Sequence, residues 1–199
     1  MNPLTSVKGT IASGFILAII VAFYLSPENS YLSTRNLSIW MHALAGVTWV
    51  GLLYYFNFVQ VPAMAEALAD EGGPGPAAIG KYVAPKALLW FRMAAAVTWL
   101  TGAWALSISP QYGFVDTFIF QAPAGHMMSI GVWLGTIMLF NVWVLIWPNQ
   151  KKILGMVEAT AEEIAKAKFT AAMASRTNVV LSVPMLLCMV GAGHGGYLF

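Results

Sequence analysis

Residues 125–147 read GHMMSIGVWLGTIMLFNVWVLIW and contain no Asp, Glu, Lys or Arg. A helix needs roughly 20 consecutive, mostly apolar residues to cross the hydrocarbon core of a bilayer. This stretch therefore predicts a membrane-spanning helix.

Four further segments meet the same requirement: residues 9–25, 37–61, 87–108 and 178–198. The last contains Pro184 and several glycines, which neighbouring helices make tolerable inside a membrane. The first run is longer than the apolar core of a signal peptide, about 7–15 residues, and no A-x-A cleavage site follows it. We therefore expect a retained first helix at the periphery and four core helices.

The composition supports this class. Hydrophobic residues make up 59% of the chain, charged residues 9%, and the mean hydropathy is +0.71. A soluble domain carries about 25% charged residues, because water must wet its surface. The sequence predicts an all-α, polytopic transmembrane bundle that forms a single membrane domain over residues 1–199.

The basic residues predict the orientation of the bundle. Lys and Arg collect in cytoplasmic loops, and here they lie before the first span, between the second and third, and between the fourth and fifth. We expect a multi-pass protein of the bacterial inner membrane, with a cytoplasmic N-terminus and Phe199 on the periplasmic side. Residues 151–175 place charges among alanines at helical spacing, which predicts a cytoplasmic helix along the membrane surface.

Several classes of function are excluded. The net charge of +2 is too small and too scattered for nucleic-acid binding. A single cysteine, Cys188, provides neither a disulfide framework nor a thiolate metal site. No Walker loop, nucleotide fingerprint, catalytic triad or C-x-x-C-H motif occurs. The lipid bilayer is the first predicted partner.

The three histidines are the candidate ligands. In the predicted topology His42, His126 and His194 lie within roughly one to two helical turns of the outer membrane face. Two imidazoles from different helices can hold a b-type haem between them. Gly46, one turn from His42, would let a porphyrin approach the backbone. Two alternatives remain: hydrogen bonds to interfacial water or neighbouring helices, and a three-histidine copper or zinc site.

Arg92 marks a second candidate site, on the inner side of the membrane. An arginine within a membrane span is a functional-site hypothesis by default. It would balance the carboxylate of a haem propionate or of an acidic substrate. The alternative is a side chain that extends to the interface without binding anything. Asn57, Gln60 and Asn141 lie on the same predicted side.

Three strings resemble a known family: WMHALAGVTWVGLLYYFNFVQ (40–60), GTIMLFNVWVLIWPNQKKILG (135–155) and SRTNVVLSVPMLLCM (175–189). They are similar to the membrane portion of the urate hydroxylase PuuD family, also called the urate oxidase N-terminal domain. Full-length members continue into a cytochrome c domain with a C-x-x-C-H motif, which this sequence lacks. The second span is also loosely similar to HemJ, a small membrane protein that binds haem b.

The resemblance implies a redox membrane bundle whose family histidines correspond to His42, His126 and His194. We expect a haem b electron-transfer protein that exchanges electrons with a cytochrome c or with other redox membrane subunits at the outer face. His42 and His126 are the preferred axial ligands, and His194 is a substitute ligand or a propionate partner. The alternatives are a cofactor-free accessory subunit of a respiratory or photosynthetic complex, and an enzyme that oxidises a purine or a porphyrinogen.

Overall fold

The computed structural model describes residues 2–25 and 33–195. In these residues the regular structure is helical, without a β-strand, which confirms the predicted all-α class. After a short 3₁₀ turn, the elements follow in this order: α1 (Val7–Leu25), α2 (Thr34–Tyr55), η2 (Phe56–Gln60), α3 (Val61–Ala69), η3 (Ile79–Val83), α4 (Ala84–Ser107), α5 (Phe114–Phe118), α6 (His126–Phe140), η4 (Asn141–Ile146), α7 (Trp147–Ile153) and α8 (Ala161–Gly193).

The elements η2, η3 and η4 are π-helical segments, and each has a proline just beyond it. Pro62, Pro85 and Pro148 are each the second residue of the following α-helix. Proline has no N–H, and its ring crowds the carbonyl four residues earlier. In all three cases the residue before the proline donates its N–H to the carbonyl five residues back, which widens the helix by one residue. The helices therefore continue past their prolines instead of ending there.

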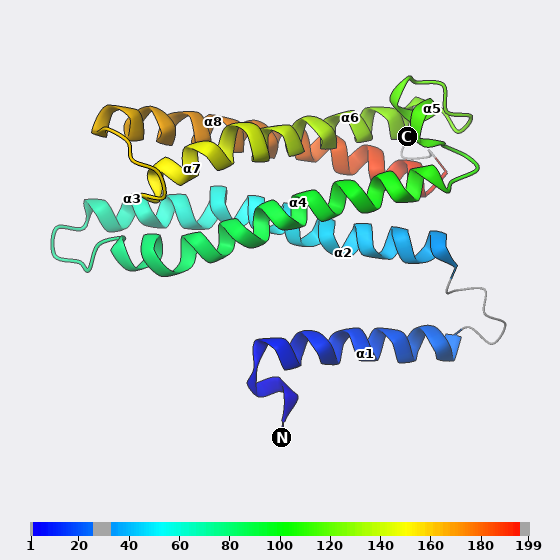
Figure 1. The fold of residues 1–199 in the computed structure, drawn as a ribbon, viewed down its shortest axis with the longest axis horizontal. Coiled ribbons are helices and arrows are strands. Elements are labelled where there is room, and N and C mark those ends of the chain that lie inside the picture. Colours follow the sequence, from blue (N-terminus) through cyan, green and yellow to red (C-terminus); the bar gives the residue numbers. More distant parts are fainter. Residues whose placement is uncertain (1, 26–32, 196–199) are drawn as a thin grey trace.

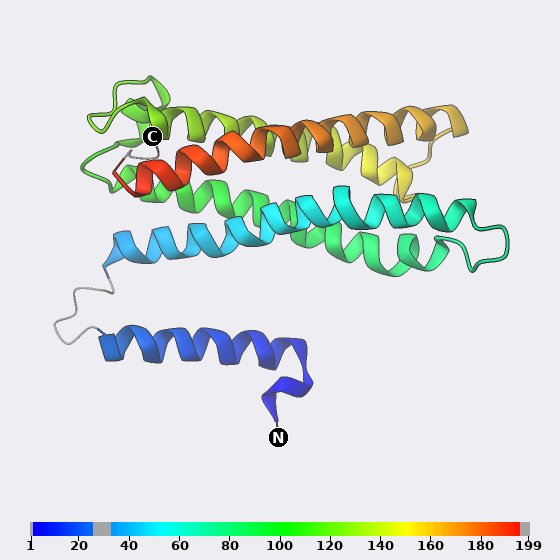
Figure 2. The same ribbon diagram turned by 180° about the vertical axis from the view of Figure 1, so that it is seen from behind.

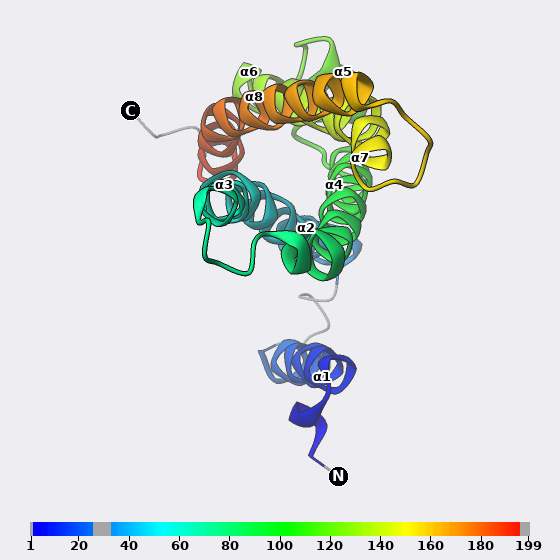
Figure 3. The ribbon, with the colours of Figure 1, turned by 90° about the vertical axis from the view of Figure 1, so that its left-hand side faces the viewer.

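Four helical rods form the bundle. The rods are α2 with α3, α4 with η3, α6 with α7, and α8, and Figures 1 and 2 show them side by side. The most extensive contacts join α2 to α4 and α6 to α8. Viewed end-on, the rods follow one another around a ring, and α1 lies outside it (Figure 3). No described residue of α1 is buried, and its Phe15 meets Trp40 of α2 edge to face with ring centroids 5.7 Å apart.

Among the described residues, four helical runs are long and apolar enough to cross a membrane: Val7–Leu25, Thr34–Ala69, His126–Ile153 and Ala161–Gly193. They correspond to four of the five predicted spans. The fifth, over residues 87–108, is α4, which is 24 residues long but contains Arg92 and two threonines in its apolar stretch. It packs along α2 within the bundle, and its crossing of the membrane stays a prediction.

The predicted surface helix over residues 151–175 is wrong. Residues 151–153 complete α7, and the remainder from Ala161 onward is the first half of α8, which continues without interruption to Gly193. The reason is the spacing of Ala167, Ala171 and Ala174, which are buried and let α8 pack closely on the neighbouring rods. The alanine-rich stretch is an extension of the bundle rather than a helix lying on the membrane.

The bundle has two ends, which we name after their residues. At the histidine end α2 and α6 begin and α8 stops, and at the lysine end lie α3, α7 and the start of α8 (Figure 1). Large apolar side chains fill the middle and the lysine half: Trp49, Leu53, Phe56, Leu88, Phe91, Met138, Val142 and Ile146. The histidine half buries Met185 and Leu106, but most of its buried residues are small or hydroxyl-bearing: Ser38, Thr98, Thr101, Thr117, Ser129, Gly131 and Gly191.

Candidate functional site

His42 is held in the seam between α2 and α4. Its Nδ1 lies 2.7 Å from the carbonyl oxygen of Thr98. A carbonyl can only accept a hydrogen bond, so Nδ1 carries the proton and donates it. In a neutral imidazole this fixes the tautomer and leaves the lone pair on Nε2. The structure therefore presents His42 in the form that can bind a metal.

The sequence around His42 explains this position. His42 and Trp49 of α2 and Phe56 of η2 recur every seven residues, so they share the core-facing stripe of this rod. On α4, a Cβ added to Gly102 would lie 2.9 Å from His42 Nδ1 and Cε1. Glycine at 102 thus makes room for the imidazole. A Cβ on Gly46 would meet only a methyl group of Thr98 at 3.7 Å, which is ordinary contact. Helix packing therefore does not require glycine at 46.

His126 and His194 lie at helix termini. His126 is the first residue of α6, directly after Gly125, whose φ of 93° suits glycine. The His126 ring is tilted against Phe120 with centroids 5.9 Å apart. His194 follows the last residue of α8, and its Nδ1 lies 2.8 Å from the carbonyl oxygen of Val190. His194 therefore has the same tautomer as His42, with Nε2 free.

Figure 1 shows that α2 and α6 begin and α8 stops at the same end of the bundle. His126 and His194 lie at two of these termini, and His42 lies about two turns into α2. Within residues 2–25 and 33–195, however, no three His, Cys, Asp or Glu side chains are grouped so that they could hold a metal ion. The alternative of a three-histidine copper or zinc site is therefore not supported. Axial ligation of a haem requires only two of the histidines, and which two they are stays a prediction.

Arg92 faces a different neighbour. Its guanidinium carbon lies 3.7 Å from the centroid of the Trp147 ring in α7, and Lys151 Nζ lies 5.9 Å from the same centroid. Among the described residues no carboxylate forms an ion pair with either cation. Thr98 is six residues beyond Arg92, about 9 Å along α4, and its carbonyl meets α2 instead of α7. Arg92 of α4 thus contacts α7, whereas His42 of α2 contacts α4 at Thr98.

Sequence reasoning missed a buried polar network along α8. Asn178 donates to the Met138 carbonyl oxygen at 3.0 Å and accepts from Asn141 Nδ2 at 2.8 Å. Ser182 pairs with the Tyr54 hydroxyl, and Ser175 accepts from Asn57. The available signal was the recurrence of polar residues at 175, 178 and 182 on one face of an apolar helix. These bonds tie α8 to both neighbouring rods in one register.

The fold and these residues define a polytopic helical membrane protein with candidate haem ligands at one end and an aromatic-bound pair of cations toward the other. Residues 105–199 match the family model described as Urate oxidase N-terminal. The predicted resemblance is thereby confirmed over this part of the chain, which contains the strings at 135–155 and 175–189. The string at 40–60 lies outside the matched residues, and similarity to HemJ is not shown. No curated protein and no solved structure gives a match.

Proposed function

We propose that this chain is a membrane-embedded electron-transfer protein that binds haem b at the histidine end. It would exchange electrons with a cytochrome c or a larger redox complex at the periplasmic face. The observation that carries the proposal is the hydrogen bond from His42 Nδ1 to the Thr98 carbonyl. Such a bond orients a ligating imidazole and raises the basicity of its other nitrogen.

Two observations support a bound planar group in the histidine half. Most of its buried residues are small or carry hydroxyls, and glycine at 46 is not required by helix packing. The Ser129 hydroxyl, one turn from His126, is fully buried and has no partner within the described residues. A buried polar atom without a partner costs about 1–3 kcal/mol, which a bound group or water would relieve.

We propose His42 as the first axial ligand. His126 and His194 are the candidates for the second, and the Nδ1 bond of His194 favours His194 on geometry. Haem b, when bound, would supply one-electron redox chemistry. The chain itself would fix the imidazole orientation through Thr98 and surround the site with apolar helices.

The absorption spectrum of the dithionite-reduced protein tests the proposal. Two histidine ligands predict a low-spin spectrum with a sharp α band and little reaction with carbon monoxide. His42→Ala should open one coordination position, giving a carbon-monoxide-reactive haem or none. Whichever of His126→Ala and His194→Ala reproduces this effect identifies the second ligand. Absence of haem from the purified protein, or no spectral change in any variant, would favour the cofactor-free accessory subunit.

A second candidate function is oxidation of a purine such as urate. The match of residues 105–199 to the urate oxidase N-terminal family favours it. In this case the chain would turn over urate when supplied with an artificial electron acceptor. A haem spectrum without urate turnover would leave electron transfer as the function of this chain.

A further inference from the structure

The α4–α6 seam contains a groove that leads to the two cations at Trp147. The groove has a volume of about 410 Å³. Its apolar lining includes Ala96, Trp99 and Leu100 of α4 and Leu139, Phe140 and Trp143 of the facing rod. At its floor, Trp99 Nε1 donates to Thr136 Oγ1 at 3.0 Å, so the indole N–H is already satisfied. The groove therefore offers an apolar surface to an apolar occupant.

The groove and the cations lie on the same faces of their helices. Ala96 is one turn beyond Arg92 on α4, and Trp143 is one turn before Trp147. On this rod the groove lining runs from Thr136 to Trp143, about 10 Å, and Trp147 lies one turn further, about 16 Å from Thr136. Half of a bilayer's hydrocarbon core is about 15 Å thick. The groove together with Trp147 thus spans about one leaflet, and the cations lie at the Trp147 end.

The cations are arranged to receive an anion. Stacking on Trp147 uses the face of the Arg92 guanidinium and leaves its in-plane N–H donors, which can bind a phosphate in bidentate fashion. Lys151 adds a second positive charge beside the same ring. The nearby Lys152 is already paired with Glu163 at 3.5 Å, so this carboxylate is engaged elsewhere. Within the described part of the chain the two charges at Trp147 have no carboxylate partner.

We propose that this surface binds an anionic phospholipid of the leaflet at the lysine end. The phosphate would contact Arg92 and Lys151, and an acyl chain would lie in the groove. Trp147 would occupy the interface between the two, where tryptophan is enriched in membrane proteins. A neutral lipid-soluble molecule such as a quinone would fill the groove without using the cations, so charge complementarity favours the phospholipid.

Lipid retention tests the proposal. The purified protein is placed in nanodiscs of phosphatidylcholine containing a minority of phosphatidylglycerol, re-extracted in detergent, and analysed by native mass spectrometry. Wild type should retain phosphatidylglycerol preferentially. The double variant Arg92→Gln/Lys151→Gln should lose about thirtyfold of this preference, since each cation near the membrane surface contributes a factor of about five. Equal retention of the two lipids by wild type would overturn the proposal.

Matched variants separate a local effect of Arg92 and Lys151 from a general effect of positive charge. Lys166→Gln/Lys168→Gln removes the same charge from exposed positions of α8 and should leave the preference unchanged. If it causes an equal loss, the effect is one of net charge and the site is wrong. If the Arg92 change prevents folding, Lys151→Gln alone tests the site. This single change should lower the preference for phosphatidylglycerol about fivefold.

The groove and the phosphate are separated by two further measurements. Ala96→Trp should block the groove and reduce phospholipid retention while both cations remain. Excess inorganic phosphate should displace little lipid from wild type. If inorganic phosphate competes fully and Ala96→Trp has no effect, the site binds free phosphate and not a lipid. Retention of a quinone that is insensitive to Arg92→Gln/Lys151→Gln would likewise overturn the phospholipid.

Discussion

The two halves of the bundle differ in the side chains that fill the space between their helices. In the lysine half, buried aromatic and aliphatic side chains fill the space between the rods, and the buried amides of Asn141 and Asn178 pair with each other. In the histidine half, most buried positions carry small or hydroxyl-bearing side chains, although Leu106 is also buried. Buried polar atoms without a partner in the described structure occur in both halves, at Ser129 and at Gln60. The two halves therefore differ in the size of their buried side chains.

The largest effect should come from breaking the amide pair in the lysine half. Asn178→Leu removes the partner of Asn141 Nδ2 and one of the two donors to the Met138 carbonyl, which keeps the backbone N–H of Asn141. Each buried group left unsatisfied costs about 1–3 kcal/mol. We expect a clearly lower free energy of unfolding in a denaturant titration in mixed micelles. Asn149→Ala, which loses only a bond within its own helix, is the control, and equal stability of the two variants would contradict the role of the pair.

In the histidine half, Gly102→Ala should act on His42. The added Cβ would lie 2.9 Å from the imidazole and push it away from the Thr98 carbonyl. We expect a loss of stability of about 1–3 kcal/mol from overpacking, and the loss of any low-spin haem signal. Gly135→Ala meets no atom within 4 Å and should be neutral or slightly stabilising. A normal spectrum in Gly102→Ala would mean that the hydrogen bond to Thr98 is not needed to hold His42 as a ligand.

A smaller effect compares two buried serines, one with hydrogen-bond partners and one without. Ser182 and Ser129 are both fully buried, but only Ser182 has hydrogen-bond partners among the described residues. Ser182→Ala should lower the free energy of unfolding by about 1 kcal/mol. Ser129→Ala should leave the cofactor-free protein unchanged or slightly more stable, because a buried orphan hydroxyl is removed. If both changes destabilise the cofactor-free protein equally, the Ser129 hydroxyl has a stabilising partner after all.

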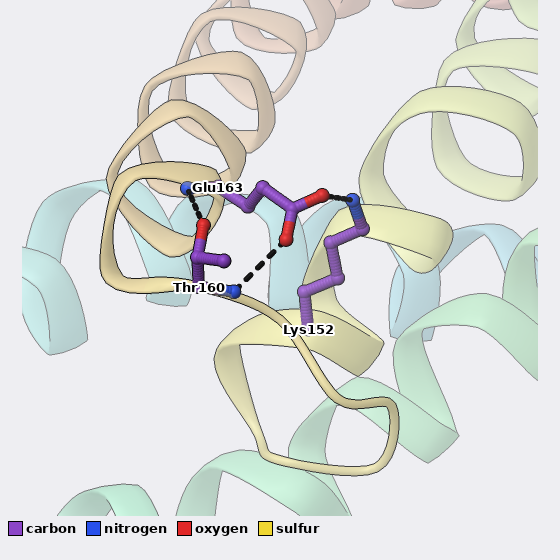
Figure 4. A network of polar contacts seen from close by, with 3 residues as sticks. All are labelled: Lys152, Thr160 and Glu163. Atoms are coloured by element: carbon purple, nitrogen blue, oxygen red, sulfur yellow. Dashed lines mark hydrogen bonds and ion pairs between the residues drawn. The ribbon is translucent and has the colours of Figure 1, made fainter.

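The smallest effect belongs to the exposed start of α8. The Thr160 backbone N–H donates to the Glu163 carboxylate at 2.9 Å, and the Thr160 hydroxyl accepts from the Glu163 N–H (Figure 4). This bond and the nearby Lys152 hold the pKa of Glu163 below its usual value. The stabilisation is present above the usual carboxyl pKa and is lost as the pH falls through the lowered one. The difference in melting temperature between wild type and Glu163→Gln should therefore shrink on acidification, and a pH-independent difference would contradict this.

The fold could be predicted from the sequence because apolar runs of this length have few other solutions in a cell. The helix ends could not. The predicted span ends at residue 61 and a proline follows, so the sequence suggested that the helix ends there. In the structure α3 follows η2 directly and continues the rod past Pro62 to Ala69. The prediction for residues 161–175 was also wrong. The charged residues there suggested a helix on the membrane surface, whereas the buried Ala167 and Ala171 pack this segment into the bundle.

The candidate site was predictable only in part. That the histidines lie toward one end follows from counting residues along the spans, and the helix bounds agree with this. The contact between Arg92 and Trp147 needed the structure, because it joins residues on two rods whose relative rotation depends on η4. The pairing of His42 with Thr98 likewise depends on the register between α2 and α4, which apolar composition alone does not specify.

The π-helical segments have a consequence for how the rods are phased. Each inserts one residue into a turn, and one residue corresponds to a rotation of about 100° around the helix axis. In the rod from α6 to α7, everything after η4 is turned by this angle relative to an uninterrupted helix, and this offset is what aims Trp147 at Arg92. The effect of Pro148 therefore extends beyond its own helical turn. By setting the phase of its rod, it decides which residues of the histidine half and of the lysine half share one face.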